Sequence, residues 1–404
     1  MSCHRFAVAV VAAFVAVLAA AHSAAAQQAD STPAPYYAGR VGLYPTIRLS
    51  NVGWDSNVYN NREAEEVGDF TSSLSPAIDA LLRSPRFNLT VHSQWDYYYF
   101  RRLASLRALD IDQSGRVEAT LNRLSPYVSG NWLSTRHRQN VEVDAMERRR
   151  DHSVEAGTYV RVSAKTFVGV SAARAAVDYE SDARFRGTEL APVLNRSTTT
   201  GTLAVRYQMT PLTTFSVGLT RGATRFPTSR ERDADSWQVG PTVEFKPLAL
   251  ISGSASVGFQ TVKFRGSTQP DFKSTVMAVD LQYTLRGRTQ FGVGATRNLE
   301  YSFLDTQVDY VLTGLATTVS HRLNDRWDAG VVASRYGLGY RRREVALAAT
   351  DVPSSTFMSY GANIGYRLGR HRIGLDVEHQ GRTSDIPLND YERLRVMSSL
   401  RYVF

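Results

Sequence analysis

Apolar and polar positions alternate through the end of the chain, residues 391–404. The apolar positions of this stretch are Leu394, Val396, Leu400, Tyr402 and Phe404. Because successive side chains of a strand point to opposite faces, this alternation predicts a strand with one apolar and one polar face. A terminal aromatic side chain suits a strand that faces lipid. The stretch is therefore interpreted as the closing strand of an outer-membrane β-barrel.

The same alternation divides the rest of the chain into strands joined by alternately long and short connections. The predicted strands are residues 41–50, 70–82, 87–100, 110–122, 127–135, 153–162, 166–179, 198–209, 213–224, 237–245, 249–264, 273–285, 290–303, 308–321, 327–340, 356–368, 372–380 and 391–404. Most are longer than the ~5–6 residues usual in soluble sheets. Long connections fit extracellular loops, and short ones fit periplasmic turns. These features predict an all-β fold, a transmembrane antiparallel up-and-down β-barrel of about 18 strands.

The start of the chain predicts export. Arg5 followed by an apolar run and by the small residues Ala24, Ala25 and Ala26 is typical of a secretory signal peptide. The predicted domains are a signal peptide over residues 1–26, a short periplasmic leader over residues 27–40, and the outer-membrane β-barrel over residues 41–404. The single cysteine, Cys3, precedes the predicted cleavage site, so no disulfide framework is expected.

Charge and hydropathy change this picture little. The mean hydropathy of −0.27 resembles that of a soluble protein, but lipid-facing and lumen-facing residues average out in a barrel. The formal charge of +9 is carried mostly by arginine. For an exported barrel, outer-membrane lipid and lipopolysaccharide are better partners than nucleic acid. Base composition explains the arginine content equally well.

The polar phase of the predicted strands is expected to face the lumen, because exposing the apolar phase to water would forfeit its transfer energy. The candidate lumen-lining residues are Asp112, Arg116, Glu118, Glu155, Arg161, Glu244, Glu300, Arg372, Asp376, Glu378 and Arg395. A barrel of this width is too wide for side chains to fill, so a water-filled channel is expected unless a loop folds inward. The alternative is a barrel that is closed by charges paired across its wall.

Two triple-arginine runs fall in predicted long loops and hence at the outer rim. These candidate anion or glycan contacts are Arg148, Arg149, Arg150, Arg341, Arg342 and Arg343. Arginine binds phosphate with two parallel hydrogen bonds, so lipopolysaccharide phosphates and acidic glycans are plausible partners. An ordinary solvated loop explains the runs as well.

No catalytic, cofactor or metal site is predicted. Asp55, Asn57 and Asn60 offer oxygen atoms, but their spacing does not match a calcium loop, and turns built by these side chains explain them. Asp151, His152 and Ser153 are neighbours in sequence, so on a strand they point to opposite faces and cannot form a triad. A barrel hydrolase is therefore disfavoured, and the prediction is that the protein is not an enzyme.

Residues 51–59, with Gly53, Asp55, Asn57 and Val58, resemble the G-x-D-x-N-V opening of the putative β-barrel porin 2 family. The length, the strand rhythm and the Tyr-Val-Phe ending are similar to that family too. The resemblance implies a role linked to exopolysaccharide, as an outer-membrane conduit with polysaccharide-export components as partners. The ending, with Leu400, Tyr402 and Phe404, also resembles the signal that the barrel-assembly machinery reads.

Two functions follow as hypotheses. The first is a porin-like outer-membrane channel for hydrophilic solutes, including secreted polysaccharide. The second is a non-conducting structural or adhesive barrel whose loops bind surface glycans or lipopolysaccharide. No cofactor is expected for either function.

Overall fold

The computed structural model describes residues 34–247, 250–266, 269–304, 307–341, 353–386 and 389–403. The predicted signal peptide and the first part of the predicted leader lie outside these residues. Over the described ranges, no helix has both the length and the apolar character needed to cross a membrane.

The described residues form eighteen long strands that make up a barrel. The first nine are β2 (Val41–Asp55), β3 (Asp69–Arg83), β4 (Phe87–Phe100), β5 (Ala108–Ala119), β6 (Leu124–Thr135), β7 (Arg149–Arg161), β8 (Thr166–Tyr179), β11 (Arg196–Thr210) and β12 (Thr213–Arg225). The other nine are β13 (Ala234–Phe245), β14 (Ile251–Phe264), β15 (Phe272–Leu285), β16 (Thr289–Tyr301), β17 (Asp309–Arg322), β18 (Trp327–Tyr340), β19 (Ser354–Leu368), β20 (His371–Ser384) and β21 (Tyr391–Val403).

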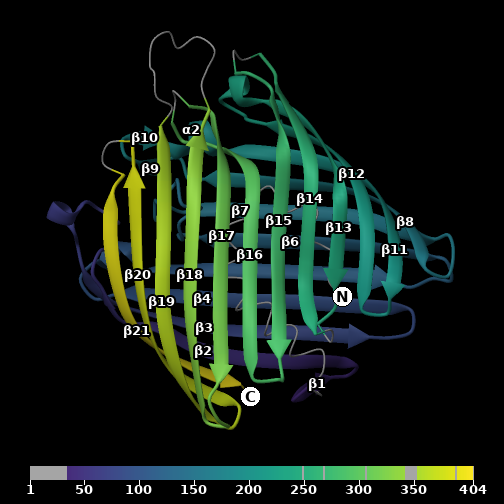
Figure 1. Cartoon of the computed structure of the whole chain (residues 1–404), viewed down its shortest axis with the longest axis horizontal. Helices are drawn as coiled ribbons and strands as arrows, with labels where there is room; N and C mark the ends of the chain where they lie inside the picture. The colour runs from purple at the N-terminus through teal and green to yellow at the C-terminus, as the bar shows by residue number, and fades with distance from the viewer. Residues whose placement is uncertain are drawn as a thin grey trace.

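Each barrel strand pairs antiparallel with the next one in the chain, and β2 pairs with β21 to close the barrel. The predicted fold class and strand number are therefore confirmed. In Figure 1 the strands from β13 to β21 form the near wall, and β2 to β8 cross behind them at a steep angle. On the near wall the short turns lie at the lower ends of the strands and the long connections at the upper ends. We call the end of the barrel with the short turns the periplasmic end and the end with the long connections the outer end.

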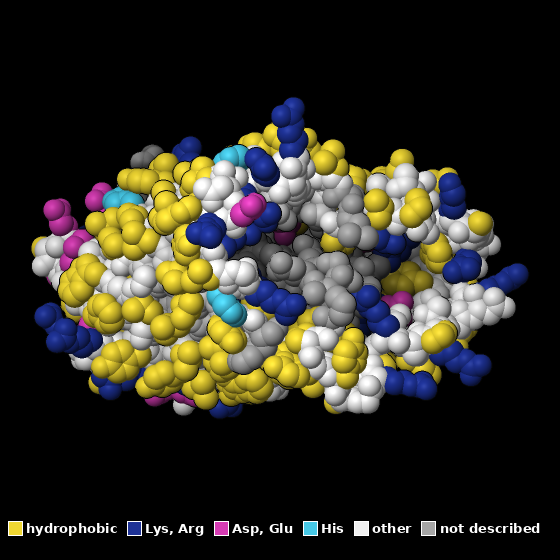
Figure 2. Space-filling view, turned by 90° about the horizontal axis from the view of Figure 1, so that it is seen from below, with side chains coloured by type: hydrophobic (Ala, Val, Ile, Leu, Met, Phe, Trp, Pro, Cys, Tyr) yellow, Lys and Arg dark blue, Asp and Glu magenta, His cyan; other side chains and the backbone are white. Residues whose placement is uncertain are grey.

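The outer face of the wall is apolar. On β20 the exposed side chains are Ile373, Leu375 and Val377, which are 41–49% exposed and occupy alternate positions. Figure 2, viewed from the periplasmic end, shows hydrophobic side chains over much of the outer surface and a hollow near the centre. The strict alternation predicted from the sequence thus separates a surface suited to lipid from a polar interior.

The predicted end of the first strand at residue 50 is wrong, because a β-bulge interrupts the alternation there. The register of β2 shifts between Leu49 and Val52 against β21, and Asn51 adopts a positive φ of 52°. A bulge adds one residue to one strand, so the inward phase changes from even to odd positions. After the bulge Trp54 is exposed, while Asp55 is buried. The strand therefore continues five residues beyond its predicted end.

The start of β2 explains how the barrel tolerates a proline in its first strand. The first described pair between β2 and β21 joins Thr46 to Val403, so Pro45 lies just outside that described ladder. A proline lacks the N–H that a ladder needs, and the edge of a pairing is where it is tolerated. Before it, the short strand β1 (Tyr36–Ala38) folds back on β2. The end of the predicted leader thus packs against the barrel.

The long connections at the outer end contain short elements. They are η1 (Glu63–Glu65), η2 (Ala104–Leu106), β9 (Arg184–Phe185), β10 (Thr188–Glu189), α2 (Leu190–Leu194) and η3 (Arg230–Arg232). Leu190 and Leu194 of α2 are buried. These connections therefore do more than link strands, because they bury side chains at the outer end of the barrel.

Candidate functional site: the lumen and its outer mouth

Residues 136–148, which join β6 to β7, form a loop that crosses the outer mouth of the barrel. We call this segment the crossing loop. The carbonyl oxygen of Val58, between β2 and β3, accepts a hydrogen bond from Arg138. On the far side of the barrel, the hydroxyl of Ser302, between β16 and β17, donates to Glu142 at 2.5 Å. The strands that flank the loop, β6 and β7, lie seven to nine places from β16 and β17 in the order of the eighteen-strand wall, so these contacts span the mouth.

Polar contacts from several strands hold the crossing loop in place. Arg382 on β20 donates to the carbonyl oxygen of Val141 at 2.8 Å, and the Tyr179 hydroxyl on β8 donates to Gln139 at 2.5 Å. Within the loop, the side-chain oxygen of Asn140 accepts from the backbone N–H groups of residues 142 and 143. The loop is therefore fixed at both ends and along its length.

Alternate apolar side chains of the crossing loop pack on opposite sides. Val141 is buried with tyrosines that include Tyr310 and Tyr340 on β17 and β18. Val143 and Ala145 are buried with α2 and the end of β8. At roughly 25 cal/mol per Å² of buried apolar area, these contacts favour the docked position of the loop. The loop narrows the passage between the outer mouth and the lumen.

Glu142 is the one carboxylate of the crossing loop that lies fully buried. Burial raises the pKa of Glu142 from the usual 4.5 to about 7, and the hydrogen bond from Ser302 and the charge of Arg382 offset only part of this rise. Tyr310 on β17, Tyr340 on β18 and Glu300 on β16 are further titratable groups that interact with it. The proton on this carboxyl therefore bears on whether the loop stays docked.

Below the loop, β5 to β13 carry a row of stacked arginine and tyrosine side chains on the polar face of the wall. The guanidinium of Arg116 lies 4.0 Å from the ring centre of Tyr127, and that of Arg206 lies 4.8 Å from the ring centre of Tyr159. The two tyrosine rings stack with their centres 5.7 Å apart. Such cation–π and aromatic contacts rigidify the wall.

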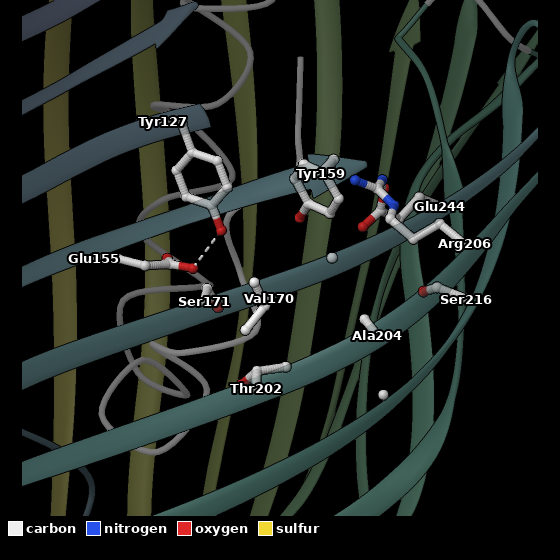
Figure 3. A pocket seen from close by; sticks show the side chains of 12 residues that line it. Tyr127, Glu155, Tyr159, Val170, Ser171, Thr202, Ala204, Arg206, Ser216 and Glu244 are labelled. Atoms are coloured by element: carbon white, nitrogen blue, oxygen red, sulfur yellow. Dashed lines mark hydrogen bonds and ion pairs between the residues drawn. The ribbon is translucent and has the colours of Figure 1, made fainter. Parts of the chain in front are cut away.

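Carboxylates complete this row by pairing with its arginines and tyrosines. Glu118 pairs with Arg116 at 2.7 Å. Glu244 pairs with Arg206 at 2.7 Å, and Glu155 accepts a hydrogen bond from the Tyr127 hydroxyl at 2.8 Å (Figure 3). A hollow in the wall lies beside these groups and is lined as well by Ser171, Thr202 and Ser216. The charges are thus balanced locally, within the wall, and hydroxyl groups remain along it.

Glycines in the neighbouring strands make room for the two tyrosines. A Cβ atom on Gly157 would lie 2.8 Å from the Tyr127 ring, and one on Gly169 would lie 2.6 Å from the Tyr159 ring. Each ring therefore lies flat over the backbone of the next strand. Larger residues at these glycines would push the rings into the lumen.

The remaining candidate lumen-lining residues are spread over the wall. Glu300 is buried and accepts from Asn298 at 2.6 Å, and Arg372 pairs with Asp328 at 2.7 Å. Asp376 accepts from Ser399 at 3.4 Å, and Arg395 pairs with Glu378 at 3.2 Å. Arg161 is exposed at the end of β7, and Asp112 is half-buried on β5. The candidates thus form several paired groups rather than one site, and their role in conduction stays a prediction.

Two of the outer-rim arginines lie in a strand rather than in the predicted loop, and two of the six are bound within the wall. Arg149 and Arg150 are the first residues of β7 rather than loop residues, and Arg149 is buried and paired with Asp151 at 2.9 Å. Arg341 pairs with the buried Asp309 at 3.2 Å and donates to the Pro270 carbonyl at 2.7 Å. Arg149 and Arg341 therefore hold the wall and its connections together.

The other rim arginines remain candidates. Arg148 lies in the crossing loop, 3.9 Å from Glu180, and Arg150 has an exposed side chain. Arg342 and Arg343 lie outside the described residues. Contact of these side chains with anions or glycans stays a prediction.

The opening motif, residues 53–58, joins the first strand to the last. Both side-chain oxygens of Asp55 accept hydrogen bonds from Arg393 on β21, with Nε at 2.8 Å from Oδ1. Asn57 donates to the carbonyl oxygen of Glu392 at 2.9 Å. A Cβ atom on Gly53 would lie only 2.0 Å from the carbonyl oxygen of Val396, so only glycine fits there. We call the pairing of β2 with β21 the seam, and the Asp55–Arg393 pair its clasp.

This geometry accounts for the polar residues that sequence analysis weighed as metal ligands. Asn57 and Asp55 are bound to β21, and Asn60 donates to Asp144 of the crossing loop at 2.6 Å. In the described part of the chain, no three His, Cys, Asp or Glu residues group in a way that suits a metal ion. The segment also contains an Asx turn, in which the Asp55 side chain accepts a hydrogen bond from the backbone N–H of Asn57 at 3.2 Å.

Of the residues predicted to form an assembly signal, Leu400 and Tyr402 are 40% and 42% exposed on the outer face of β21. Phe404 lies outside the described residues. Their exposure on the lipid-facing side agrees with the alternation of apolar residues in this strand.

Sequence reasoning missed the crossing loop, the Tyr127–Tyr159 stack and the clasp. The crossing loop carried one signal, because Val141, Val143 and Ala145 occupy alternate positions within an otherwise charged connection. The clasp carried none beyond the family motif, since its two residues lie 338 positions apart.

Comparison with known proteins gives a family and a set of similar barrels. A family model described as "Putative beta-barrel porin 2" matches residues 31–404. The chain is similar to a BenF-like porin from Pseudomonas fluorescens Pf-5, with 10% identity and a TM-score of 0.49 over 91% of this chain and 100% of that chain. For Pseudomonas aeruginosa OpdK with vanillate, the identity is 8% and the TM-score 0.47, over 90% and 99% of the two chains. No curated protein sequence matches the chain.

Proposed function

The chain belongs to the putative β-barrel porin 2 family and forms a porin-like outer-membrane barrel, and we propose that this barrel is a channel for hydrophilic solutes. The observation that carries the proposal is the polar inner wall of an eighteen-strand barrel, with its charges paired within the wall. Along β5 to β13 this local pairing leaves hydroxyl groups at the inner surface of the wall. A barrel of this width leaves an aqueous path unless loops fill it.

The test is the conductance of the purified full-length barrel in a planar lipid bilayer. We expect discrete current steps after insertion, and none from heat-unfolded protein at the same concentration. The fold of the purified protein is checked by its migration on unheated gels. Absence of current steps from protein that this check shows to be folded would contradict the proposal.

The crossing loop supports the second candidate function, a non-conducting barrel that binds surface glycans or lipopolysaccharide. Its apolar side chains pack into clusters at the mouth, which is how a closed barrel would look. Arg148 and Arg150 then offer cationic contacts at the outer end. A folded barrel without conductance that binds lipopolysaccharide vesicles would favour this function over a channel.

We propose secreted polysaccharide as one solute class for this channel, and the polar lining of the wall supports this proposal. The hollow beside Tyr159 is lined by Ser171, Thr202 and Ser216 and by paired charges, all of which can exchange hydrogen bonds with sugar hydroxyls. We propose that polysaccharide-export components and the barrel-assembly machinery are partners, and that cleavage after Ala26 precedes insertion. Amino-terminal sequencing of the membrane-bound protein tests the cleavage, and co-purification tests the partners.

The open time of the channel is expected to increase with pH, because the ionisation of Glu142 weakens the docking of the crossing loop. Between about pH 4.5 and 7 the docked loop keeps a proton on Glu142 that an undocked loop would release, so docking is strongest in acid and weakens as the pH rises through about 7. Each pKa unit corresponds to about 1.4 kcal/mol, so the full effect is about 3 kcal/mol. Open time in bilayer recordings should therefore be greater at pH 8 than at pH 5.

The matched control is Glu142→Gln, which keeps the shape of the side chain and removes its titration. We expect this variant to hold the loop docked at both pH values and to give similar open times at both. An unchanged pH response in Glu142→Gln would show that another group controls the loop.

A further inference from the structure

We propose that Arg48 and Arg401 form an oxyanion-binding site on the lumenal side of the seam, for the phosphate, sulfate or carboxylate group of a solute. This inference rests on the proposed channel function in one respect, which is that the solute reaches the site through the lumen. The site itself is a property of the wall and can be tested without conduction.

The site begins with a row of arginines at the same level of four neighbouring strands. Arg48 on β2 lies directly opposite Arg401 on β21, and Arg401 lies directly opposite Arg372 on β20. Arg372 in turn lies opposite Arg367 on β19. Directly opposite side chains in an antiparallel pair have Cβ atoms roughly 5 Å apart. Like charges at this spacing destabilise a sheet unless something compensates them.

These side chains face the interior. Ile47 and Leu49, on either side of Arg48, are exposed on the outer face, and so are Leu400 and Tyr402 on either side of Arg401. Alternation then places both guanidinium groups on the lumenal face of the wall. The level is close to the periplasmic end, two residues above the Thr46–Val403 pair. Figure 2 shows Lys and Arg side chains around the hollow at this end.

Two of the four arginines in the row, Arg367 and Arg372, pair with a carboxylate, and the other two do not. Asp328 on β18 accepts from Arg367 at 2.6 Å and from Arg372 at 2.7 Å. The Arg372 guanidinium lies over Gly365 of β19, which directs it away from the seam. Over the described residues, no carboxylate pairs with Arg48 or Arg401, and the charges that act on Arg401 are those of Arg48 and Arg372.

The carboxylates closest along these strands are engaged elsewhere. Asp376, on the same face of β20, accepts a hydrogen bond from Ser399, and Asp79 on β3 is bound to His92 at 2.7 Å. On the other side of Arg48, its direct partner on β3 is Ser75, which can donate a hydrogen bond but carries no charge. The two unpaired guanidinium groups are therefore flanked by neutral or already bound side chains.

This arrangement suits an oxyanion. Each guanidinium offers a planar fork of N–H donors that matches the oxygen pairs of carboxylate, phosphate and sulfate groups. Both arginines are only partly buried, so a solute can reach them. A bound anion would also screen the repulsion between β2 and β21, and would join the two ends of the chain through one ligand.

The first experiment measures the thermal unfolding midpoint of the detergent-solubilised full-length barrel, at constant ionic strength, with sodium chloride, inorganic phosphate or glucuronate. We expect phosphate or glucuronate to raise the midpoint above that in chloride. In the double variant Arg48→Gln, Arg401→Gln this anion-specific rise should vanish, while the midpoint in chloride stays equal or increases because the repulsion is gone. Arg161→Gln, at the same end of the wall, serves as the control and should keep the wild-type response.

The second experiment uses chloride current in a planar bilayer, with phosphate or glucuronate added to the periplasmic side. The concentration that halves the current should rise at least about tenfold in the double variant, which corresponds to about 1.4 kcal/mol of binding. A rise with phosphate alone or with glucuronate alone identifies the source of the oxyanion. Equal responses of wild type and double variant in the unfolding experiment would overturn the site. Absent current with an intact anion-specific midpoint shift would sink the channel function and leave the site standing.

Discussion

Replacing Asp55 with alanine should lower the free energy of unfolding of the barrel by about 3–5 kcal/mol, because it leaves a buried charge without its partner. Arg393 is 9% exposed, and both side-chain oxygens of Asp55 bind its guanidinium. In Asp55→Ala the guanidinium keeps its charge in a poorly hydrated position. Urea titration of the refolded barrel, followed by tryptophan fluorescence, measures the loss as a lower midpoint.

Two variants separate the clasp from a general effect of losing a carboxylate. Asp178 is a half-exposed carboxylate near the outer end of β8, 3.8 Å from His152, and Asp178→Ala should cost no more than about 1 kcal/mol. The double variant Asp55→Ala, Arg393→Met removes both buried charges and should recover most of the loss. If Asp55→Ala and Asp178→Ala shift the midpoint equally, the clasp does not stabilise the seam.

Shortening the crossing loop should raise the single-channel conductance at least about twofold, because conduction depends on the dimensions and lining of the passage. The variant replaces residues 138–147 with four glycine and serine residues. Thr135 and Arg149 lie directly opposite each other at the ends of β6 and β7, so a short linker joins them without moving the strands. The wall retains its eighteen strands, and only the segment across the mouth is lost.

The matched control shortens a connection at the same end that points to solvent. Residues Glu63, Ala64 and Glu65 are exposed, and their removal should leave the conductance unchanged. Both variants are checked for folding by their migration on unheated gels. Equal conductance of the crossing-loop variant and the wild type would mean that the solute path does not pass the loop.

The wall of the barrel could be predicted from the sequence because burial on one side imposes a strict alternation. β18 was predicted with the bounds that the structure has, Trp327–Tyr340. β20 was predicted to end at Gln380 but continues to Ser384, because Gly381, Arg382, Thr383 and Ser384 lie above the lipid-facing stretch and carry no apolar alternation. The end of a strand can thus be predicted from the sequence only where the strand faces lipid, because apolar and polar residues alternate there.

The candidate site was predictable only in part, because the contacts that build it join distant residues. Polar alternation placed Arg116, Glu118 and Glu244 on one face, yet nothing local indicates that Arg206 pairs with Glu244 across an intervening strand. Glu142 reads as an ordinary loop carboxylate, and its burial depends on Ser302, 160 positions away. Arg48 was missed because its partner across the seam, Arg401, lies at the other end of the chain.

The seam has a consequence for the order in which the barrel assembles. Every other pairing of barrel strands joins neighbours in the chain, so hairpins can form as the chain emerges, whereas β2 must wait for β21. Contacts between residues far apart in the sequence form late, because the entropic cost of closing the long loop must be met before the contacts stabilise the chain. A chain that ends before β21 leaves two open edges of unpaired backbone groups, which a lipid environment does not tolerate. Closure of the barrel therefore depends on the thirteen residues of β21, so a chain that lacks them cannot form a closed barrel.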